Sequence, residues 1–260
     1  MSSAGPINDS PTNKNEEPKG PDWFRQSFGD LYNLVYAHRS LEAARKEIQA
    51  LARWAPLSSG DAVLDVCCGN GRHLAAILEL GCDAVGFDLS PELIAVAKRR
   101  PALTDRVFRG DVRNIPFNRR FQRVVNLFTS FGYFQSDDEN VHAFMEMASR
   151  VETGGVFILD HMNAGRIRRT LVPESMEEKE GFRIVQQRQL SGLRVQKRIE
   201  VTRLSDHATW EFQEDVRMFD PLEMIEMARN SGFTKVTLHG SFQGEAFSEE
   251  SERMILRGAV

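Results

Sequence analysis

The stretch VLDVCCGNGRH, from Val63 to His73, decides how this chain folds. An apolar run ends around Asp65, the chain then passes through Gly69 and Gly71, and an amphipathic segment follows. Glycine permits positive φ and lets the backbone approach a ligand closely, while the N–H groups that open a helix attract negative charge. The stretch therefore predicts a strand, a loop and a helix that together bind a nucleotide-like ligand.

A second acidic residue indicates which ligand this is. Asp88 ends the next apolar run, AVGFD, seventeen residues after Gly71, where an acid accepts hydrogen bonds from ribose hydroxyls. A dinucleotide-binding loop usually has a third glycine beside the pyrophosphate, and this loop lacks it. Asp65 is unfavourable beside a pyrophosphate but suits a ligand with an amino group. These two departures favour S-adenosylmethionine over NAD.

Short apolar runs alternate with amphipathic segments on both sides of this loop, which is typical of βαβ units and a parallel sheet. A further helix and two strands follow near the end of the chain. We predict strands at 62–66, 83–88, 107–110, 123–128, 155–160, 234–239 and 253–260, with helices near 72–80, 91–99, 139–151 and 221–230.

Residues 182–219 have a different pattern, because their apolar residues alternate at period two between turn signals. This pattern predicts an inserted sheet of three antiparallel strands. We therefore divide the chain into a disordered tail (1–21), N-terminal lid helices with the cofactor-binding core (22–165), the inserted sheet (166–220), and a last helix with two strands (221–260). The tail is assigned from its four prolines and few apolar residues.

Composition limits the function classes. The 260 residues include 41% hydrophobic residues and a formal charge of -4, which offers no broad basic surface for nucleic acid. Only three cysteines occur, without CxxC spacing, so neither a disulfide framework nor a metal site is expected. No apolar run approaches the roughly 20 residues that span a bilayer. We expect a cytoplasmic protein with no membrane partner.

Four motifs together resemble the class I S-adenosylmethionine-dependent methyltransferases, in the branch that acts on small molecules. VLDVCCGNGRH is similar to the first family motif, acid-x-G-x-G-x-G, with Cys67 in place of the first glycine. VGFDLSPELIAVAK resembles the second, in which Asp88 binds the ribose and Leu89 lies beside the adenine. These two motifs imply that Asp65, Cys67, Gly69 and Gly71 also contribute to the cofactor site.

The other two motifs complete the implied cofactor site. VFRGDVRNIPF resembles the third motif, where Asp111 accepts from the adenine amino group and the Val112 N–H meets a ring nitrogen. RVVNLFTSFGYF resembles the fourth, which places Asn126 and Phe128 towards the methionine portion. By the same resemblance Tyr36 belongs to an N-terminal lid over the methionine end, with simple core packing as the alternative.

The resemblance implies a Rossmann-like α/β fold, with a seven-stranded sheet, helices on both faces and an antiparallel last strand. It also implies methyl transfer to an N, O or S atom of a small molecule, with N slightly favoured and S-adenosylhomocysteine as product. The inserted sheet would roof the substrate site or form a homodimer contact. Two alternatives stay open: a non-catalytic subunit that binds S-adenosylmethionine, and an RNA methyltransferase.

Two residues at strand ends are candidates for the chemistry. His161 follows the fifth strand, and its ordinary pKa suits a general base near neutral pH. Tyr133, just past the fourth strand, is a candidate for orienting the substrate. For both residues a packing role is the alternative. We further expect His73 to pack or to contact a carboxylate, Cys67 to lie against the cofactor, and Cys68 to point into the core.

Overall fold

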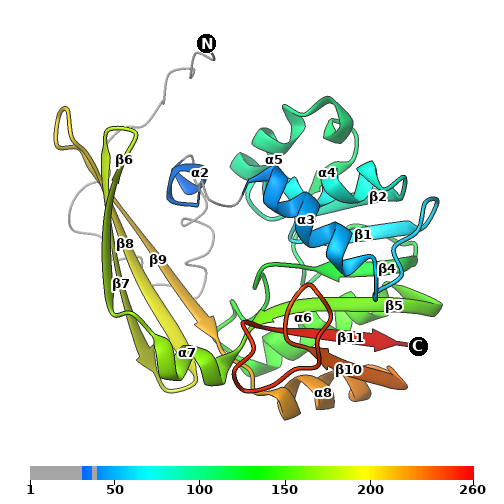
Figure 1. The fold of residues 1–260 in the computed structure, drawn as a ribbon. Coiled ribbons are helices and arrows are strands. Elements are labelled where there is room, and N and C mark those ends of the chain that lie inside the picture. The colour runs from blue at the N-terminus through cyan, green and yellow to red at the C-terminus, as the bar shows by residue number, and fades with distance from the viewer. Residues whose placement is uncertain (1–30, 37–39) are drawn as a thin grey trace.

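The computed structural model describes residues 31–36 and 40–260. Its elements form a large mixed sheet covered by helices and a separate antiparallel sheet, which stand side by side in Figure 1. The tail predicted for residues 1–21, and the start of the lid predicted after it, lie outside the described residues.

The elements follow one another in a repeating strand–helix order. The helices are α2 (Tyr32–Val35), α3 (Leu41–Leu51), α4 (Arg72–Glu79), α5 (Pro91–Lys98), η1 (Pro101–Leu103), α6 (Asp137–Ser149), α7 (Ala164–Thr170) and α8 (Pro221–Asn230). The strands of the large sheet are β1 (Ala62–Val66), β2 (Asp83–Asp88), β3 (Val107–Arg109), β4 (Phe121–Asn126), β5 (Val151–Met162), β10 (Lys235–His239) and β11 (Arg253–Ala259). The strands of the separate sheet are β6 (Glu174–Lys179), β7 (Phe182–Ser191), β8 (Arg194–Arg203) and β9 (Thr209–Arg217).

The large sheet has the order β10-β11-β5-β4-β1-β2-β3, and β11 alone runs opposite to its other strands. The chain starts in the middle at β1, extends to one edge through β2 and β3, and then crosses back to β4. The connections that leave the carboxyl ends of β1 and β4 therefore run in opposite directions at this crossing point, where open α/β sheets bind ligands. The predicted seven-stranded Rossmann-like fold with an antiparallel last strand is confirmed.

Short sequence signals start the helices that cover the sheet. The hydroxyls of Ser40 and Ser90 accept the N–H groups of Ala43 and Leu93, each at 3.1 Å, and so cap α3 and α5. Pro91 occupies the first turn of α5, where its missing N–H costs no helical bond. These caps hold the helix starts at the same edge of the sheet as the ligand site.

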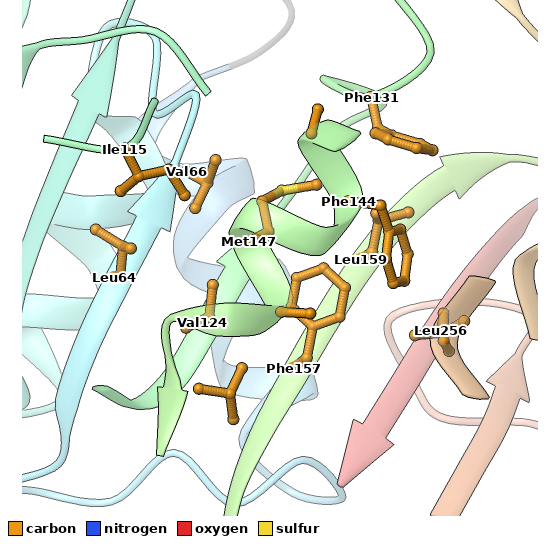
Figure 2. Close-up of a cluster of buried hydrophobic side chains, with 14 of the residues drawn as sticks. Leu64, Val66, Ile115, Val124, Phe131, Phe144, Met147, Phe157, Leu159 and Leu256 are labelled. Carbon is orange, nitrogen blue, oxygen red and sulfur yellow. The ribbon is translucent and has the colours of Figure 1, made fainter. Parts of the chain in front are cut away.

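Two apolar layers enclose the sheet. One layer lies between the sheet and α3, α4 and α5, and includes Ile48, Leu74 and Ile94. The other lies beneath α6 and α8, and Figure 2 shows part of it, with Phe144 and Met147 of α6 against Phe157 of β5. Burial of aromatic side chains of this size provides much of the free energy of folding.

The separate sheet has four strands in the order β6-β7-β8-β9, one more than the sequence predicts. The additional edge strand β6 reads ESMEEK, and its charged, largely exposed residues lack the apolar alternation on which the prediction rests. The buried face of the sheet packs Ile184, Val201 and Trp210 against Val35, the last residue of α2, and Tyr36, which follows it. The N-terminal segment is thus attached to the inserted sheet.

Candidate functional site

The glycine loop between β1 and α4 has three residues with positive φ, at Cys67 (58°), Gly69 (56°) and Gly71 (73°). A Cβ added at Gly71 would lie 2.5 Å from Leu103 Cδ1 and 3.3 Å from Ala97 Cβ, so this glycine is needed for packing beneath the loop. A Cβ at Gly69 would meet nothing closer than 3.9 Å. Cys67 adopts the left-handed conformation that L-residues rarely take, at the position where the family motif has glycine.

Asp88 ties this loop to the end of β2. Its carboxylate accepts the Gly69 N–H at 2.8 Å and the Ser90 N–H at 2.9 Å. Burial raises the pKa of Asp88, and the backbone N–H groups of Ser90 and Gly69 oppose that shift by stabilising the charged form. The acid therefore stands at the carboxyl edge of the sheet with its charge partly satisfied by the loop itself.

A cavity of about 550 Å³ opens beside Asp88 and extends along the carboxyl ends of β1, β2, β3 and β4. This volume is typical of a small-molecule or cofactor site. Most of the predicted site residues line it: Tyr36, Cys67, Gly69, Asp88, Leu89, Asp111, Val112, Asn126, Phe128 and Tyr133. Residues from four strand ends and from the N-terminal segment are thus brought to one place.

Two predicted cofactor residues lie behind the cavity wall rather than on it. Gly71 is one, and its role in the structure is the close packing described above. Asp65 is the other, 2% exposed, with no hydrogen-bond partner for Oδ2 among the described residues. Burial, followed by repulsion from Asp88, raises the pKa of Asp65 to about 8. The Asp65 carboxyl is therefore mostly protonated at pH 7 and does not face the cavity.

His161 also lies outside the cavity lining. Its side chain is fully buried beside Phe131 and Phe219, with ring centroids 6.3 and 5.8 Å away. Its Nδ1 lies 3.1 Å from the Met162 carbonyl, and a Cβ at Gly132 would lie 3.4 Å from its Nε2. Burial lowers the pKa of His161 to about 4. The imidazole is therefore neutral at pH 7 and stands behind the Phe131–Gly132 wall.

The two adjacent cysteines are thiols at neutral pH. Burial raises the pKa of both Cys67 and Cys68 well above the ordinary value, and nearby Asp65 and Asp88 raise it further. The Cys68 side chain packs against Gly86, where an added Cβ would lie 2.9 Å from Cys68 Cβ. Neither cysteine has the lowered pKa of a reactive thiolate.

Some residues of the site were not predicted from the sequence. Glu47 of α3 accepts from Arg72 Nη1 at 2.9 Å and lies 2.7 Å from His73 Nε2, so the carboxylate expected near His73 comes from another helix. Burial favours a higher pKa for Glu47, but the His73 and Arg72 contacts lower it overall. Phe131 and Phe134 also line the cavity, and the aromatic run FGYF was their only sequence signal.

Comparisons with known proteins agree with this geometry. Residues 63–155 match a family described as a methyltransferase domain. A dTDP-3-amino-3,4,6-trideoxy-alpha-D-glucopyranose N,N-dimethyltransferase of Streptomyces venezuelae is 32% identical over 134 residues, which is 50% of this chain and 55% of that protein. Residues 63–155 therefore carry a methyltransferase domain, and the comparisons support a class I S-adenosylmethionine-dependent methyltransferase.

Two further proteins extend the comparison. A dTDP-3-amino-3,6-dideoxy-alpha-D-glucopyranose N,N-dimethyltransferase of Streptomyces fradiae is 31% identical over 135 residues, covering 50% of this chain and 51% of that protein. The sugar N-methyltransferase KedS8 of Streptoalloteichus shares the fold, with a TM-score of 0.71, 22% identity, and coverage of 98% of this chain and 99% of that one. The chain spans about half the length of the two curated relatives that it matches.

Two kinds of feature are absent from residues 31–36 and 40–260. No helix there is long and apolar enough to cross a membrane. No three His, Cys, Asp or Glu side chains there are grouped to hold a metal ion.

Proposed function

We propose that this protein transfers a methyl group from S-adenosylmethionine to a nitrogen atom of a small molecule, and that an amino sugar is its substrate class. The observation that carries the proposal is the cavity at the carboxyl edge of the sheet, with the Gly69 loop and Asp88 on one side and Asn126 and Phe128 on the other.

The residues of the cavity fit S-adenosylmethionine. Asn126 is 1% exposed and donates from Nδ2 to the Val66 carbonyl at 3.0 Å, while its Oδ1 has no hydrogen-bond partner in the described part of the chain. An unpaired buried acceptor is costly unless a ligand supplies a donor. The amino group of the methionine portion supplies such a donor.

The remaining lining residues divide between the two ends of the cofactor. We assign Asp88 to the ribose, and Leu89, Asp111 and Val112 to the adenine, because they lie at the ends of β2 and β3. We assign Cys67, Gly69, Phe128 and Tyr36 to the methionine end. When bound, S-adenosylmethionine supplies an electrophilic methyl group on its sulfonium.

The segment from Ser130 to Phe134 is our candidate for the acceptor side, because it lines the cavity directly after the residues assigned to the methionine end. Tyr133 is the residue that we expect to orient the acceptor. Aromatic walls at Phe131 and Phe134 exclude water and hold the amine in line with the methyl group. Positioning of this kind provides a large part of the rate of a two-substrate reaction, so a base in direct contact is not required.

A base role for His161 stays a proposal with its own test. The imidazole is in its proton-accepting form at neutral pH, but it would need a path past the Phe131–Gly132 wall. We expect His161→Ala to lower kcat and to remove one ionisation from its pH profile if the role is real. An unchanged kcat and pH profile would assign His161 to packing.

Two observations favour an amino sugar. Both curated relatives described above are named as N,N-dimethyltransferases of dTDP-amino sugars. The inserted antiparallel sheet and the N-terminal segment, joined through Tyr36, stand beside the cavity and are suited to enclose an acceptor larger than an amino acid.

Calorimetric titration tests the cofactor, with S-adenosylmethionine and S-adenosylhomocysteine as ligands and NADH as the comparison. We expect binding of the first two and none of NADH. Mass spectrometry of reactions with dTDP-amino sugars, glycine and short peptides then tests the acceptor. A mass gain of one or two methyl groups on the amino sugars alone supports the proposal, whereas cofactor binding without any product would favour a non-catalytic subunit.

A further inference from the structure

The cavity wall at Phe128 is built from a strained pair of residues. Phe128 and Thr129 have φ values of 66° and 58°, so two consecutive L-residues occupy the left-handed region, one residue beyond the end of β4. Each such residue is disfavoured in isolation and persists only where its surroundings hold it. Phe128 lines the cavity, so the contacts that hold this pair also determine the shape of the wall.

Asp160, at the end of β5, binds the backbone of both residues. Its Oδ2 accepts the Phe128 N–H at 2.8 Å, and its carbonyl accepts the Thr129 N–H at 2.9 Å. The Asp160 side chain is fully buried. A buried carboxylate needs a charged partner to stay ionised without a large cost.

Arg253 is that partner, and it comes from the first position of the last strand. Its Nε and Nη2 donate to the two carboxylate oxygens of Asp160 at 2.7 and 2.9 Å, and Nη2 also donates to Thr129 Oγ1 at 2.9 Å. Its guanidinium carbon lies 5.3 Å from the centre of the Phe128 ring. One side chain therefore contacts Asp160, Thr129 and the Phe128 ring together.

The Phe128 ring has a second guanidinium beside it. Arg72, in the first turn of α4 after the glycine loop, lies 4.4 Å from the ring centre, and Glu47 accepts from Arg72 in turn. Arg72 from α4 and Arg253 from β11 thus contact the same aromatic ring. This ring is the point at which the C-terminal strand reaches the cofactor cavity.

We propose that Arg253 is a positioning residue for the methionine end of the cofactor. It fixes Asp160, which fixes the left-handed Phe128–Thr129 pair and so the cavity wall against the amino-acid portion of S-adenosylmethionine. The inference rests on the proposed cofactor. It adds that recognition of the amino-acid portion depends on Arg253, which lies more than one hundred positions after Phe128 in the sequence. Arg253 itself lies outside the cavity lining.

Two ligands separate this role from a general loss of structure. S-adenosylhomocysteine carries the amino-acid portion, and 5′-methylthioadenosine lacks it while keeping the adenosine. We expect Arg253→Met to weaken S-adenosylhomocysteine binding by roughly 10-fold or more, the range for losing hydrogen bonds to a charged group. Binding of 5′-methylthioadenosine is expected to change by less than about 3-fold, because the adenosine end is remote from Arg253.

Two further variants make the result decisive. Arg253→Lys keeps a positive charge beside the buried Asp160 and so protects folding, but it cannot make the forked contact with Asp160 and Thr129. We expect a smaller loss that is again selective for S-adenosylhomocysteine. Arg257→Met, four positions along β11, is the matched control, because Arg257 makes no ion pair within residues 31–36 and 40–260.

Calorimetry with both ligands, at temperatures below the measured Tm of each variant, gives the answer. The proposal is overturned if Arg253→Met and Arg253→Lys reduce the affinities for both ligands equally, or leave both unchanged. If the unmodified protein binds neither ligand, the proposed cofactor fails instead, and the two failures are therefore distinguishable.

Discussion

The packing beneath the glycine loop leads to a specific prediction for Gly71→Ala. The substitution puts a Cβ 2.5 Å from Leu103 Cδ1 and 3.3 Å from Ala97 Cβ, in a residue with φ of 73°. The left-handed conformation costs an alanine about 1–2 kcal/mol, partly offset by about 0.4–1 kcal/mol from the less flexible unfolded chain. Overpacking in a filled core adds about 1–3 kcal/mol. We expect a total destabilisation of about 2–4 kcal/mol.

Gly192→Ala is the matched control for the backbone part of this cost. Gly192 lies in the β7–β8 turn with φ of 58°, and a Cβ there would meet nothing within 4 Å. The free energy of unfolding of Gly192→Ala should fall by only about 1 kcal/mol, which is the net cost of placing an alanine in the left-handed conformation. Urea unfolding of the three proteins, followed by circular dichroism, gives the two differences. Equal losses in Gly71→Ala and Gly192→Ala would refute the packing argument and return Gly71 to a role in ligand contact.

Three other predictions concern the cavity and the buried imidazole. Asp88→Ala should weaken S-adenosylhomocysteine binding by about 10-fold or more in calorimetry, whereas Asp83→Ala, at the exposed start of the same strand, should leave it unchanged. Cys67→Gly should keep that affinity within about 3-fold, because glycine suits the positive φ; a large loss would point to a role for the thiol. His161 binds a proton less readily in the folded state, so it lowers stability as pH falls from about 6.5 towards 4, by roughly 3 kcal/mol in all. His161→Phe should therefore show a shallower fall in unfolding free energy over that range, and an unchanged slope would contradict the buried neutral imidazole.

The regular elements of the large sheet could be predicted because they depend on local pattern. β1 and β2 have the bounds that the apolar runs predict, and α5 starts where Ser90 and Pro91 indicate. The spacing of apolar residues and the capping of a helix depend on a few neighbouring residues, so both can be recognised without the tertiary structure. The fourth antiparallel strand was missed because β6 is held at a sheet edge by backbone pairing with β7, and that pairing requires no apolar pattern.

Some features of the candidate site could likewise be predicted from local sequence, and others could not. The sequence by itself determined the family motifs, the glycine loop and the acid at the end of β2, since each is a short run of adjacent residues. Only the tertiary structure showed that His161 lies behind Phe131 and Gly132, and that Gly71 serves packing against Leu103.

The contacts of Phe128 were also decided by the tertiary structure alone. Its ring meets Arg253, which is 125 positions away in sequence, and its amide meets Asp160 on a neighbouring strand. The order of the strands in the sheet brings Phe128, Asp160 and Arg253 into contact. The free energy of such contacts depends on burial and distance in space, and neither quantity is encoded in any single stretch of the chain.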